Sequence, residues 1–403
     1  MDRDQLDFSP VPGIRLAAGA AGIRYRNRDD LVLVELAEGL TCAATFTRNA
    51  FCAAPVTLAR THLASAAPRW WLINAGNANA GTGERGLADA RASCEALAGL
   101  TGASAEEVLP FSTGVIGEHL PVERLVATLP VLLGSLDAAG WPRAARAIMT
   151  TDTVPKLVSR RFEIAGRTAT LTGMAKGAGM ICPDMATLLA FLATDAAVDR
   201  TLLRDLLRDA VDGSFNAITV DGDTSTNDSC VIAATGALGN PEIVDAASAD
   251  AAALRSALRS VCLELATAIV RDAEGATKLV RISVEDARDP GEARRVADTI
   301  AHSPLVKTAL FASDPNWGRI LAAVGRASLE DLAIQRVRIW LGEVLIVEDG
   351  GRAAGYTEAA GAAVMRGSEI PIRVALGRGD ARAELLTCDL SYDYVRINAE
   401  YRT

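Results

Sequence analysis

Apolar residues follow two different periods along the chain. Between residues 86 and 99 they recur every three or four positions, which predicts a helix with one buried face. A longer helix is predicted from near Ser248, with an apolar stripe that reaches Ile269 and Gly275 as its C-cap. A short helix opens at the capping box of residues 104–107 and stops at Pro110. The residues that follow, 111–117, predict a strand running into a turn.

Alternating strand patterns dominate after residue 275. They cover residues 279–284, 336–340, 344–347, 370–376 and 381–388. The last two segments predict a hairpin across Gly377-Arg378-Gly379-Asp380. Helical and strand patterns together favour an α/β protein. The change from helical to strand patterns predicts a lobe boundary near residue 275.

Composition narrows the class of protein. The 403 residues suffice for two or three domains and a core without disulfides. A net charge of −9 argues against a broad nucleic-acid-binding face. The seven cysteines form no C-x-x-C pair, which favours a reducing compartment over a disulfide framework or zinc site. The longest apolar run, 185–194, is about half a membrane span, and residues 1–10 do not resemble a secretory signal. We expect a cytoplasmic protein.

The usual catalytic and phosphate-binding motifs are missing. The three histidines have no metal or triad partner nearby in sequence, so the chemistry is expected not to use histidine. Residues 74–81 are rich in small residues and suit either a phosphate cradle or a tight turn packed on another backbone; the turn is favoured. Residues 221–228 begin like a calcium loop, but Thr226 and Ile232 occupy the positions that require Gly and Glu. No metal site is predicted.

A glycine-rich stretch with one lysine, residues 173–180, precedes Pro183-Asp184 and then Thr187. The local sequence pattern favours a structural interpretation, in which the glycine-rich stretch is a loop that leads into a buried strand. The functional alternative begins with the shortage of histidine, because a threonine hydroxyl needs a base. Cleavage between Ala186 and Thr187 would create an α-amino group with a pKa of about 7.7–8.0 beside that hydroxyl, which suits a general base near neutral pH.

These residues and other blocks resemble the glutamate N-acetyltransferases, also called ornithine acetyltransferases, of arginine biosynthesis. The resemblance covers essentially the whole chain in order, in residues 73–80, 112–118, 149–153, 174–191, 214–229, 272–278, 303–321 and 397–403. The sequence departs from the family pattern at Ala178, Cys182 and Asp184. Asp184 could alter the rate of processing but leaves the nucleophile in place.

The resemblance implies roles for individual residues. Thr187 is expected to become the N-terminal nucleophile of a β chain, 187–403, after cleavage from an α chain, 1–186. Thr113 and Gly114 match the oxyanion hole, through a hydroxyl and a backbone N–H. The substrate-binding positions match Thr153, Lys176, Thr187, Glu274, Asn398 and Thr403. By charge, we assign Lys176 to the anionic end of the substrate and Glu274 to the cationic end.

The family also implies a fold and a reaction. The fold is a layered α/β sandwich of the self-cleaving ornithine acetyltransferase and aminopeptidase/esterase type, with a second mixed α/β lobe at the C-terminus. Acetyl moves from N2-acetylornithine to glutamate through an acetyl-enzyme, in a ping-pong reaction without metal or redox cofactor. Acetyl-CoA as a second donor stays open. The α and β chains are expected to remain together as α2β2, without nucleic-acid or membrane partners.

Other interpretations remain beside this one. A related self-processing hydrolase would pass the acyl group to water, and a paralogue would use another acyl amino acid. A nucleotide-binding or non-catalytic α/β protein would use the loop at 74–81. Structurally, Thr113 could be a turn residue, Glu274 could close the helix before Gly275, and residues 398–403 could be a frayed tail.

Overall fold

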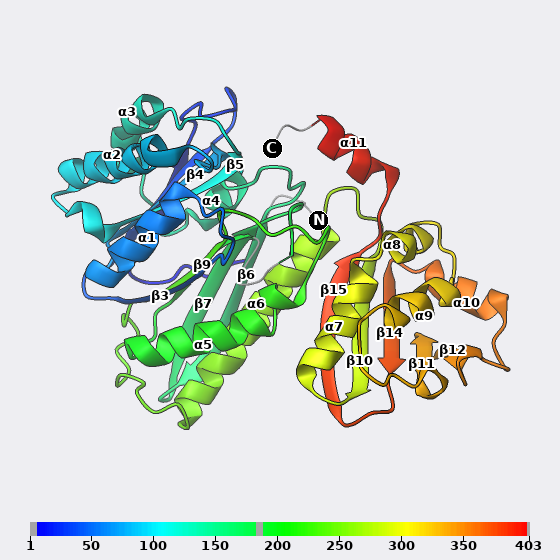
Figure 1. Ribbon diagram of the computed structural model, residues 1–403. Helices are drawn as coiled ribbons and strands as arrows, with labels where there is room; N and C mark the ends of the chain where they lie inside the picture. The colour runs from blue at the N-terminus through cyan, green and yellow to red at the C-terminus, as the bar shows by residue number, and fades with distance from the viewer. Residues whose placement is uncertain (1–5, 183–187, 401–403) are drawn as a thin grey trace. The chain divides into compact units, whose positions relative to one another are not determined.

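The computed structural model describes residues 6–182 and 188–400. Contacts divide the chain into two units (Figure 1). Unit 1 holds the residues up to Asn216 together with Asp223–Ile269, and unit 2 holds Ala217–Gly222 and the residues from Val270 onward. The change at Ile269 lies close to the lobe boundary expected near 275. The division into α and β chains stays a prediction.

Unit 1 contains two sheets and the helices that cover them. Its strands are β1 (Ile14–Gly19), β2 (Leu31–Leu36), β3 (Thr41–Phe46), β4 (Trp70–Asn77), β5 (Val108–Val115), β6 (Lys156–Ile164), β7 (Arg167–Lys176), β8 (Leu189–Thr194) and β9 (Ser229–Ala234). Its helices are α1 (Ala54–Ser65), α2 (Gly83–Thr101), α3 (Val122–Leu133), α4 (Trp141–Ala147), α5 (Arg200–Asp212) and α6 (Ala249–Arg271). The four-stranded sheet has the order β1-β2-β4-β5, and the five-stranded sheet the order β3-β9-β8-β7-β6.

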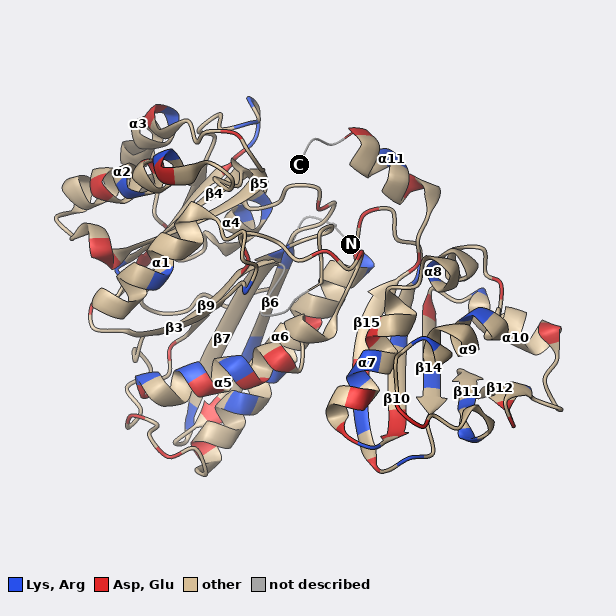
Figure 2. Cartoon of the chain, viewed as in Figure 1, with Lys and Arg blue, Asp and Glu red and all other residues tan. Residues whose placement is uncertain are grey.

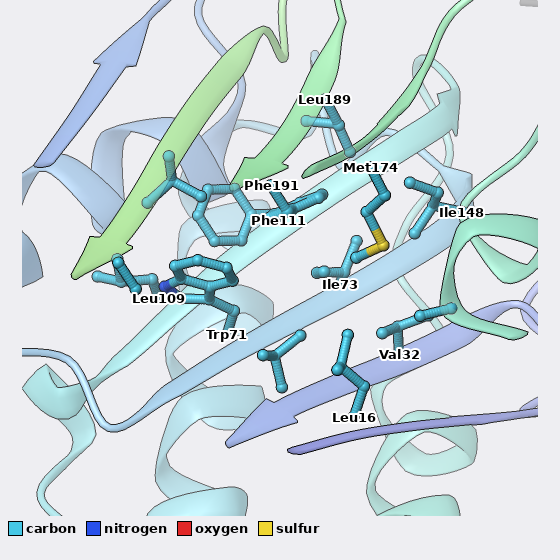
Figure 3. Packing of buried hydrophobic residues seen from close by; sticks show 14 of the residues in the cluster. Leu16, Val32, Trp71, Ile73, Leu109, Phe111, Ile148, Met174, Leu189 and Phe191 are labelled. Atoms are coloured by element: carbon cyan, nitrogen blue, oxygen red, sulfur yellow. The ribbon is translucent and has the colours of Figure 1, made fainter. Parts of the chain in front are cut away.

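The two sheets of unit 1 pack face to face. Figure 3 shows Trp71 and Ile73 of one sheet against Phe191 and Met174 of the other. Phe111 meets Phe191 edge-on, with ring centroids 5.0 Å apart. Aromatic rings in this arrangement add to the stabilisation that comes from burying their surface. The inner strand faces are therefore apolar, and polar residues gather where the strands end.

Helices cover the outer face of each sheet. Helices α1, α2 and α3 lie on the four-stranded sheet, and α5 and α6 on the five-stranded one (Figure 1). Gly173 of β7 leaves room for Leu192 of β8 and for α6, since an added Cβ would lie 2.3 Å from Leu192 and 3.2 Å from both Leu265 and Val261. The outward faces of α5 and α6 carry charges of both signs (Figure 2). Unit 1 is thus a four-layered α/β sandwich, which confirms the expected fold class.

Unit 2 is a six-stranded mixed sheet with helices. Its strands are β10 (Leu279–Ala287), β11 (Arg338–Leu341), β12 (Val344–Glu348), β13 (Gly351–Arg352), β14 (Glu369–Ala375) and β15 (Ala381–Cys388). Its helices are α7 (Pro290–Ala301), α8 (Pro304–Phe311), α9 (Trp317–Gly325), α10 (Glu358–Met365) and α11 (Tyr392–Glu400). The strand order is β13-β12-β11-β14-β10-β15. A core of its own, centred on β10, β14 and α7, makes this the expected mixed α/β lobe.

The predicted hairpin of the last two strands is wrong. Strand β10 lies between them, parallel to β14 and antiparallel to β15. The connection crosses the end of β10, where Leu376 N donates to Glu285 O at 3.0 Å and Arg378 N to Asp286 O at 2.7 Å. Gly379 permits the crossing, since an added Cβ would lie 2.4 Å from the Ala287 carbonyl oxygen.

Two helix ends also differ from their predictions. The capping box at Ser104 is present, but it opens one turn of 3-10 helix, Ala105–Glu107, and Pro110 lies inside β5 instead of ending a helix. Helix α6 ends at Arg271, before the expected cap at Gly275. Helix α2 covers the predicted span 86–99 and closes on Gly102, whose φ of 74° is the left-handed cap that glycine favours. None of the helices in the described ranges combines the length and apolarity needed to cross a membrane.

Candidate active site at the sheet ends of unit 1

Strand β5 carries Thr113 and Gly114 at a β-bulge. The parallel register with β4 shifts at Gly76, which pairs with Gly114. Gly114 has a φ of +132°, and an added Cβ would lie 2.2 Å from the Gly76 carbonyl carbon, so only glycine fits. Thr113 is therefore a strand residue, not the turn residue that local physics allowed. The close approach of two backbones at Gly76 agrees with the packing expected for residues 74–81, but residues 74–77 are the end of strand β4 and not part of a turn.

Lys176, the last residue of β7, reaches Thr113. Its Nζ lies 3.2 Å from Thr113 Oγ1, and both side chains are buried. An ammonium group can only donate hydrogen bonds, so the hydroxyl oxygen accepts and its own proton points to another acceptor. The pair thus prepares a hydroxyl donor beside the Gly114 backbone, which is the arrangement an oxyanion hole needs.

A buried ion pair between Lys156 and Asp152 lies close to Lys176. Lys156 Nζ donates to Asp152 Oδ1 at 2.6 Å, and the Gly177 N–H donates to the same oxygen at 2.8 Å. Burial would raise the pKa of Asp152, but the charges of Lys156 and Lys176 outweigh it and lower that pKa to about 2. Thr153, a predicted substrate-binding residue, follows directly and is exposed. Asp152 therefore fixes the backbone beside Thr153.

The segment that leads into β9 joins the two sheets. Asn227 Nδ2 donates to Ser112 O at 2.9 Å and to Ala78 O at 2.6 Å, on the β5 side. The main chain of the neighbouring Asp228 bonds to the other sheet, where Thr47 N donates to Asp228 O at 2.9 Å. Burial raises the pKa of Asp228 well above its ordinary value, although Ser225 and the charge of Lys176 oppose the shift.

Asp152, Asn227 and Asp228 were not among the predicted site residues. All three lie in blocks that carry the family resemblance, residues 149–153 and 214–229, so the resemblance could have indicated them as candidates. Nothing in those blocks indicates which residues face one another. Local spacing suggested only a failed calcium loop for 221–228.

The predicted cleavage site lies in the connection between β7 and β8. These strands are antiparallel neighbours, and Lys176 is the register partner of Leu189. Thr187, Ala186 and Asp184 lie outside the described residues. Lys176 belongs to a strand rather than to the glycine-rich loop expected there, and the buried strand predicted to follow is β8. Ala178 is buried and Cys182 half-buried in the same connection.

Unit 2 holds the other predicted binding residues. Asn398 of α11 donates from Nδ2 to Glu274 Oε2 at 2.8 Å and to Tyr394 O at 3.0 Å. Glu274 is buried and lies beyond the end of α6, so it does not close that helix. Gly275 packs against the first turn of α11, since an added Cβ would lie 2.5 Å from Tyr394 N, and Ser391 Oγ, just before that helix, donates to the Gly275 carbonyl at 2.6 Å. Asn398 is thus part of a helix rather than a frayed tail, and Thr403 lies outside the described residues.

The structure therefore forms two groups from the predicted residues. Thr113, Gly114 and Lys176 come together in unit 1, with Thr153 beside Asp152, while Glu274 and Asn398 pair in unit 2. In the part of the chain that the structure describes, no three His, Cys, Asp or Glu side chains are placed to hold a metal ion. Burial raises the pKa of the Cys42, Cys94 and Cys262 thiols to about 12, which suits structural rather than nucleophilic cysteines.

Comparisons with known proteins agree over almost the full length. The ArgJ family model matches residues 15–403. The chain is 63% identical over 404 residues to the arginine biosynthesis bifunctional protein ArgJ of Methylococcus capsulatus, covering 100% of this chain and 98% of that relative. It is 54% identical over 394 residues to the protein of the same name from Pseudomonas syringae pv. tomato, covering 98% and 97%.

A solved structure gives a further match. The crystal structure of arginine biosynthesis bifunctional protein ArgJ from Bacillus halodurans aligns with a TM-score of 0.50 and 39% sequence identity. The alignment covers 98% of that chain but 52% of this one. The solved chain therefore corresponds to about half of the length described above.

Proposed function

The chain belongs to the ArgJ family, and from this premise we propose that it is an acetyltransferase of arginine biosynthesis. It moves the acetyl group of N2-acetylornithine to glutamate through an acetyl-Thr187 intermediate. The enzyme is thus a glutamate N-acetyltransferase. Acetyl-CoA-dependent acetylation of glutamate would be a second activity of the same site, and the bifunctional names of the relatives favour testing it.

One observation carries the chemistry. Lys176 donates to Thr113 and so turns the Thr113 hydroxyl proton toward another acceptor, next to the Gly114 backbone. In the proposed reaction Thr187 attacks the acetyl carbonyl and its α-amino group takes the hydroxyl proton. Thr113 and Gly114 stabilise the oxyanion, ornithine leaves, and glutamate accepts the acetyl group. Each oxyanion donor of this kind is worth about 10²–10³ in rate. The scheme uses no metal or redox cofactor.

The binding roles follow from charge. Glu274 carries the negative charge that suits the cationic end of ornithine, and Asn398 orients its carboxylate. Lys176 suits a substrate carboxylate less well than the sequence suggested, since its ammonium already bonds Thr113 and interacts with two buried aspartates. We therefore assign Lys176 mainly to the oxyanion hole. Thr153 and Thr403 complete the proposed binding set.

Maturation is proposed at the Ala186–Thr187 bond. A family structure whose chain aligns with 52% of this one supports a product of about half length. The two fragments are proposed to stay associated as α2β2 and to work in the cytoplasm, where seven free thiols remain reduced. Sizing of the purified protein would test the assembly.

The test combines cleavage with acetyl transfer. Wild-type protein should give two bands on a denaturing gel, with Thr187 at the start of the second, and Thr187→Ala should give one intact, inactive chain. Acetyl release from acetylornithine should need glutamate. Equal release with and without glutamate would identify a hydrolase instead, and an uncut, fully active wild-type chain would exclude the mechanism. An assay with acetyl-CoA as the sole acetyl donor would show whether the enzyme also has the second activity.

A further inference from the structure

Two segments of unit 2 that lie far apart in sequence carry its pair of proposed binding residues. Glu274 belongs to the connection between α6 and β10, and Asn398 belongs to α11, the helix after β15. The hydrogen bond from Asn398 Nδ2 to Glu274 Oε2, 2.8 Å long, ties the two segments together. The geometry of this pair therefore depends on how α11 is held against the connection.

Helix α11 has little apolar packing to keep it in place. None of its nine residues is buried, and the helix lies beyond the end of β15 rather than on a face of the unit 2 sheet (Figure 1). Its contacts include the Tyr392 ring edge-on to Phe311, with centroids 5.5 Å apart, and a hydrogen bond from Tyr394 Oη to Asp221 Oδ2 at 3.2 Å. A helix of this length is marginal in water without tertiary packing. The position of Asn398 is thus sensitive to how the start of α11 is fixed.

Ser391 joins the start of α11 to the Glu274 segment through one hydroxyl group. Its side chain is buried and directly precedes the helix. Its Oγ accepts hydrogen bonds from Asp393 N at 3.2 Å and from Tyr394 N at 3.3 Å, which is the N-cap arrangement. The same hydroxyl donates its proton to the carbonyl of Gly275, the residue after Glu274, at 2.6 Å. The one donor and two acceptor sites of this hydroxyl are therefore all in use.

The connection between α6 and β10 is itself fixed to the end of β15. Asp389, which follows β15, is buried, and its carboxylate accepts hydrogen bonds from Thr277 N at 2.8 Å, Thr277 Oγ1 at 2.6 Å and Lys278 N at 2.9 Å. Gly275 has a φ of +67°, and an added Cβ would lie 2.5 Å from Tyr394 N. The first turn of α11 thus lies directly on a connection that does not move with the helix.

We propose that Ser391 is a positioning residue for the binding of the acetyl donor. It sets Asn398 against Glu274 by capping α11 and bonding the Gly275 carbonyl, and it acts through this pair rather than on the acetyl group. Without the hydroxyl, α11 spends less time in the position where Asn398 orients the Glu274 carboxylate. The affinity for the cationic end of acetylornithine falls with that fraction, whereas the acetyl-transfer step does not change. The role rests on the proposed function, in which this pair binds acetylornithine.

The experiment measures steady-state kinetics of acetyl transfer from acetylornithine to glutamate. Ser391→Ala should raise KM for acetylornithine about threefold to fivefold and leave kcat within about twofold of wild type, because losing a serine N-cap destabilises a helix that has little other support. Ser391→Thr keeps the hydroxyl and should restore KM. In an Asn398→Ala background, Ser391→Ala should change KM by less than about twofold, since the hydroxyl acts through Asn398.

Ser303→Ala is the matched control. Ser303 is also a buried serine of unit 2, and it caps helix α8 by accepting a hydrogen bond from Val306 N at 3.4 Å. Its substitution removes the same kind of cap from another helix and should leave KM unchanged. If Ser391→Ala fails to fold, Gly275→Ala tests the same contact from the other side, because its Cβ would displace the first turn of α11 and raise KM in the same way.

Hydrogen exchange separates this inference from the proposed function. In Ser391→Ala the backbone N–H groups of α11 should exchange at least about threefold faster than in wild type, while those of α8 do not change. Wild-type protein that transfers no acetyl group from acetylornithine would contradict the proposed function itself. Active wild-type protein with an unchanged KM in both Ser391→Ala and Gly275→Ala would overturn only the role of Ser391. An equal rise of KM in Ser303→Ala would do the same.

Discussion

The two groups of predicted site residues are held by different kinds of structure. In unit 1, Thr113 and Lys176 lie near strand ends, buried, with their backbones fixed by neighbouring strands. In unit 2, Glu274 lies after a helix and its partner Asn398 lies on the exposed helix α11. Sheet ends hold donors to the accuracy that stabilising a transition state requires, whereas an exposed helix suits the recognition of a substrate end.

The largest expected effect comes from breaking the buried ion pair of unit 1. Asp152→Asn leaves Lys156 and Lys176 without their carboxylate and should lower the free energy of unfolding by about 3–5 kcal/mol. Chemical denaturation would measure this loss. The control is Glu384→Gln in unit 2, whose exposed pair with Arg281 should be worth at most about 1 kcal/mol. Equal losses in both variants would contradict the contrast between the units.

The same residue gives a pH signature. Because the folded pKa of Asp152, about 2, lies below its unfolded value of about 3.9, the contribution is complete above about pH 4. It is lost as the pH falls from about 4 to about 2. Asp152→Asn should remove that part of the acid dependence, as measured by denaturation at several pH values. An unchanged acid dependence would show that Asp152 is not paired as described.

The next effect concerns the hydroxyl that Lys176 orients. Thr113→Val keeps the shape of the side chain but removes the donor, and should lower kcat by about 10²–10³ with little change in KM. Thr113→Ser retains a hydroxyl and should recover most of the rate. Steady-state kinetics with acetylornithine and glutamate decides between them. Loss confined to KM would place Thr113 in ground-state binding instead.

The smallest expected effect lies in unit 2. Glu274→Gln keeps an acceptor for Asn398 but removes the charge, so KM for acetylornithine should rise about tenfold while kcat changes less. Asn398→Ala should give a weaker effect of the same kind. A hundredfold loss of kcat in Glu274→Gln would show that unit 2 also contributes to the chemistry, and the distinction drawn between the two units would fail.

Local patterns predicted the elements better than their partners. The strands at 370–376 and 381–388 were found from alternation, but their pairing was not, because β10 inserts from almost a hundred residues away in sequence. Pro110 is tolerated in β5 because this strand lies at the edge of its sheet, next to β4, where a missing backbone N–H costs no ladder bond. Alternation of apolar and polar residues predicts that a segment is a strand. Which strands it pairs with depends on how apolar faces are buried across the whole core.

The sequence by itself determined the α/β class, the family and the nucleophile to examine. The scarcity of histidine and the ordered blocks of resemblance were sufficient for that, because they are properties of the chain. Only the tertiary structure decided that Lys176 bonds Thr113 and that Asn227 bonds Ser112. These contacts join β5 to β7 and to the segment before β9, which meet only when two sheets stack. Burial there raises the pKa of Asp228, whereas the charges of Lys156 and Lys176 lower the pKa of Asp152, and no local pattern of residues encodes either effect.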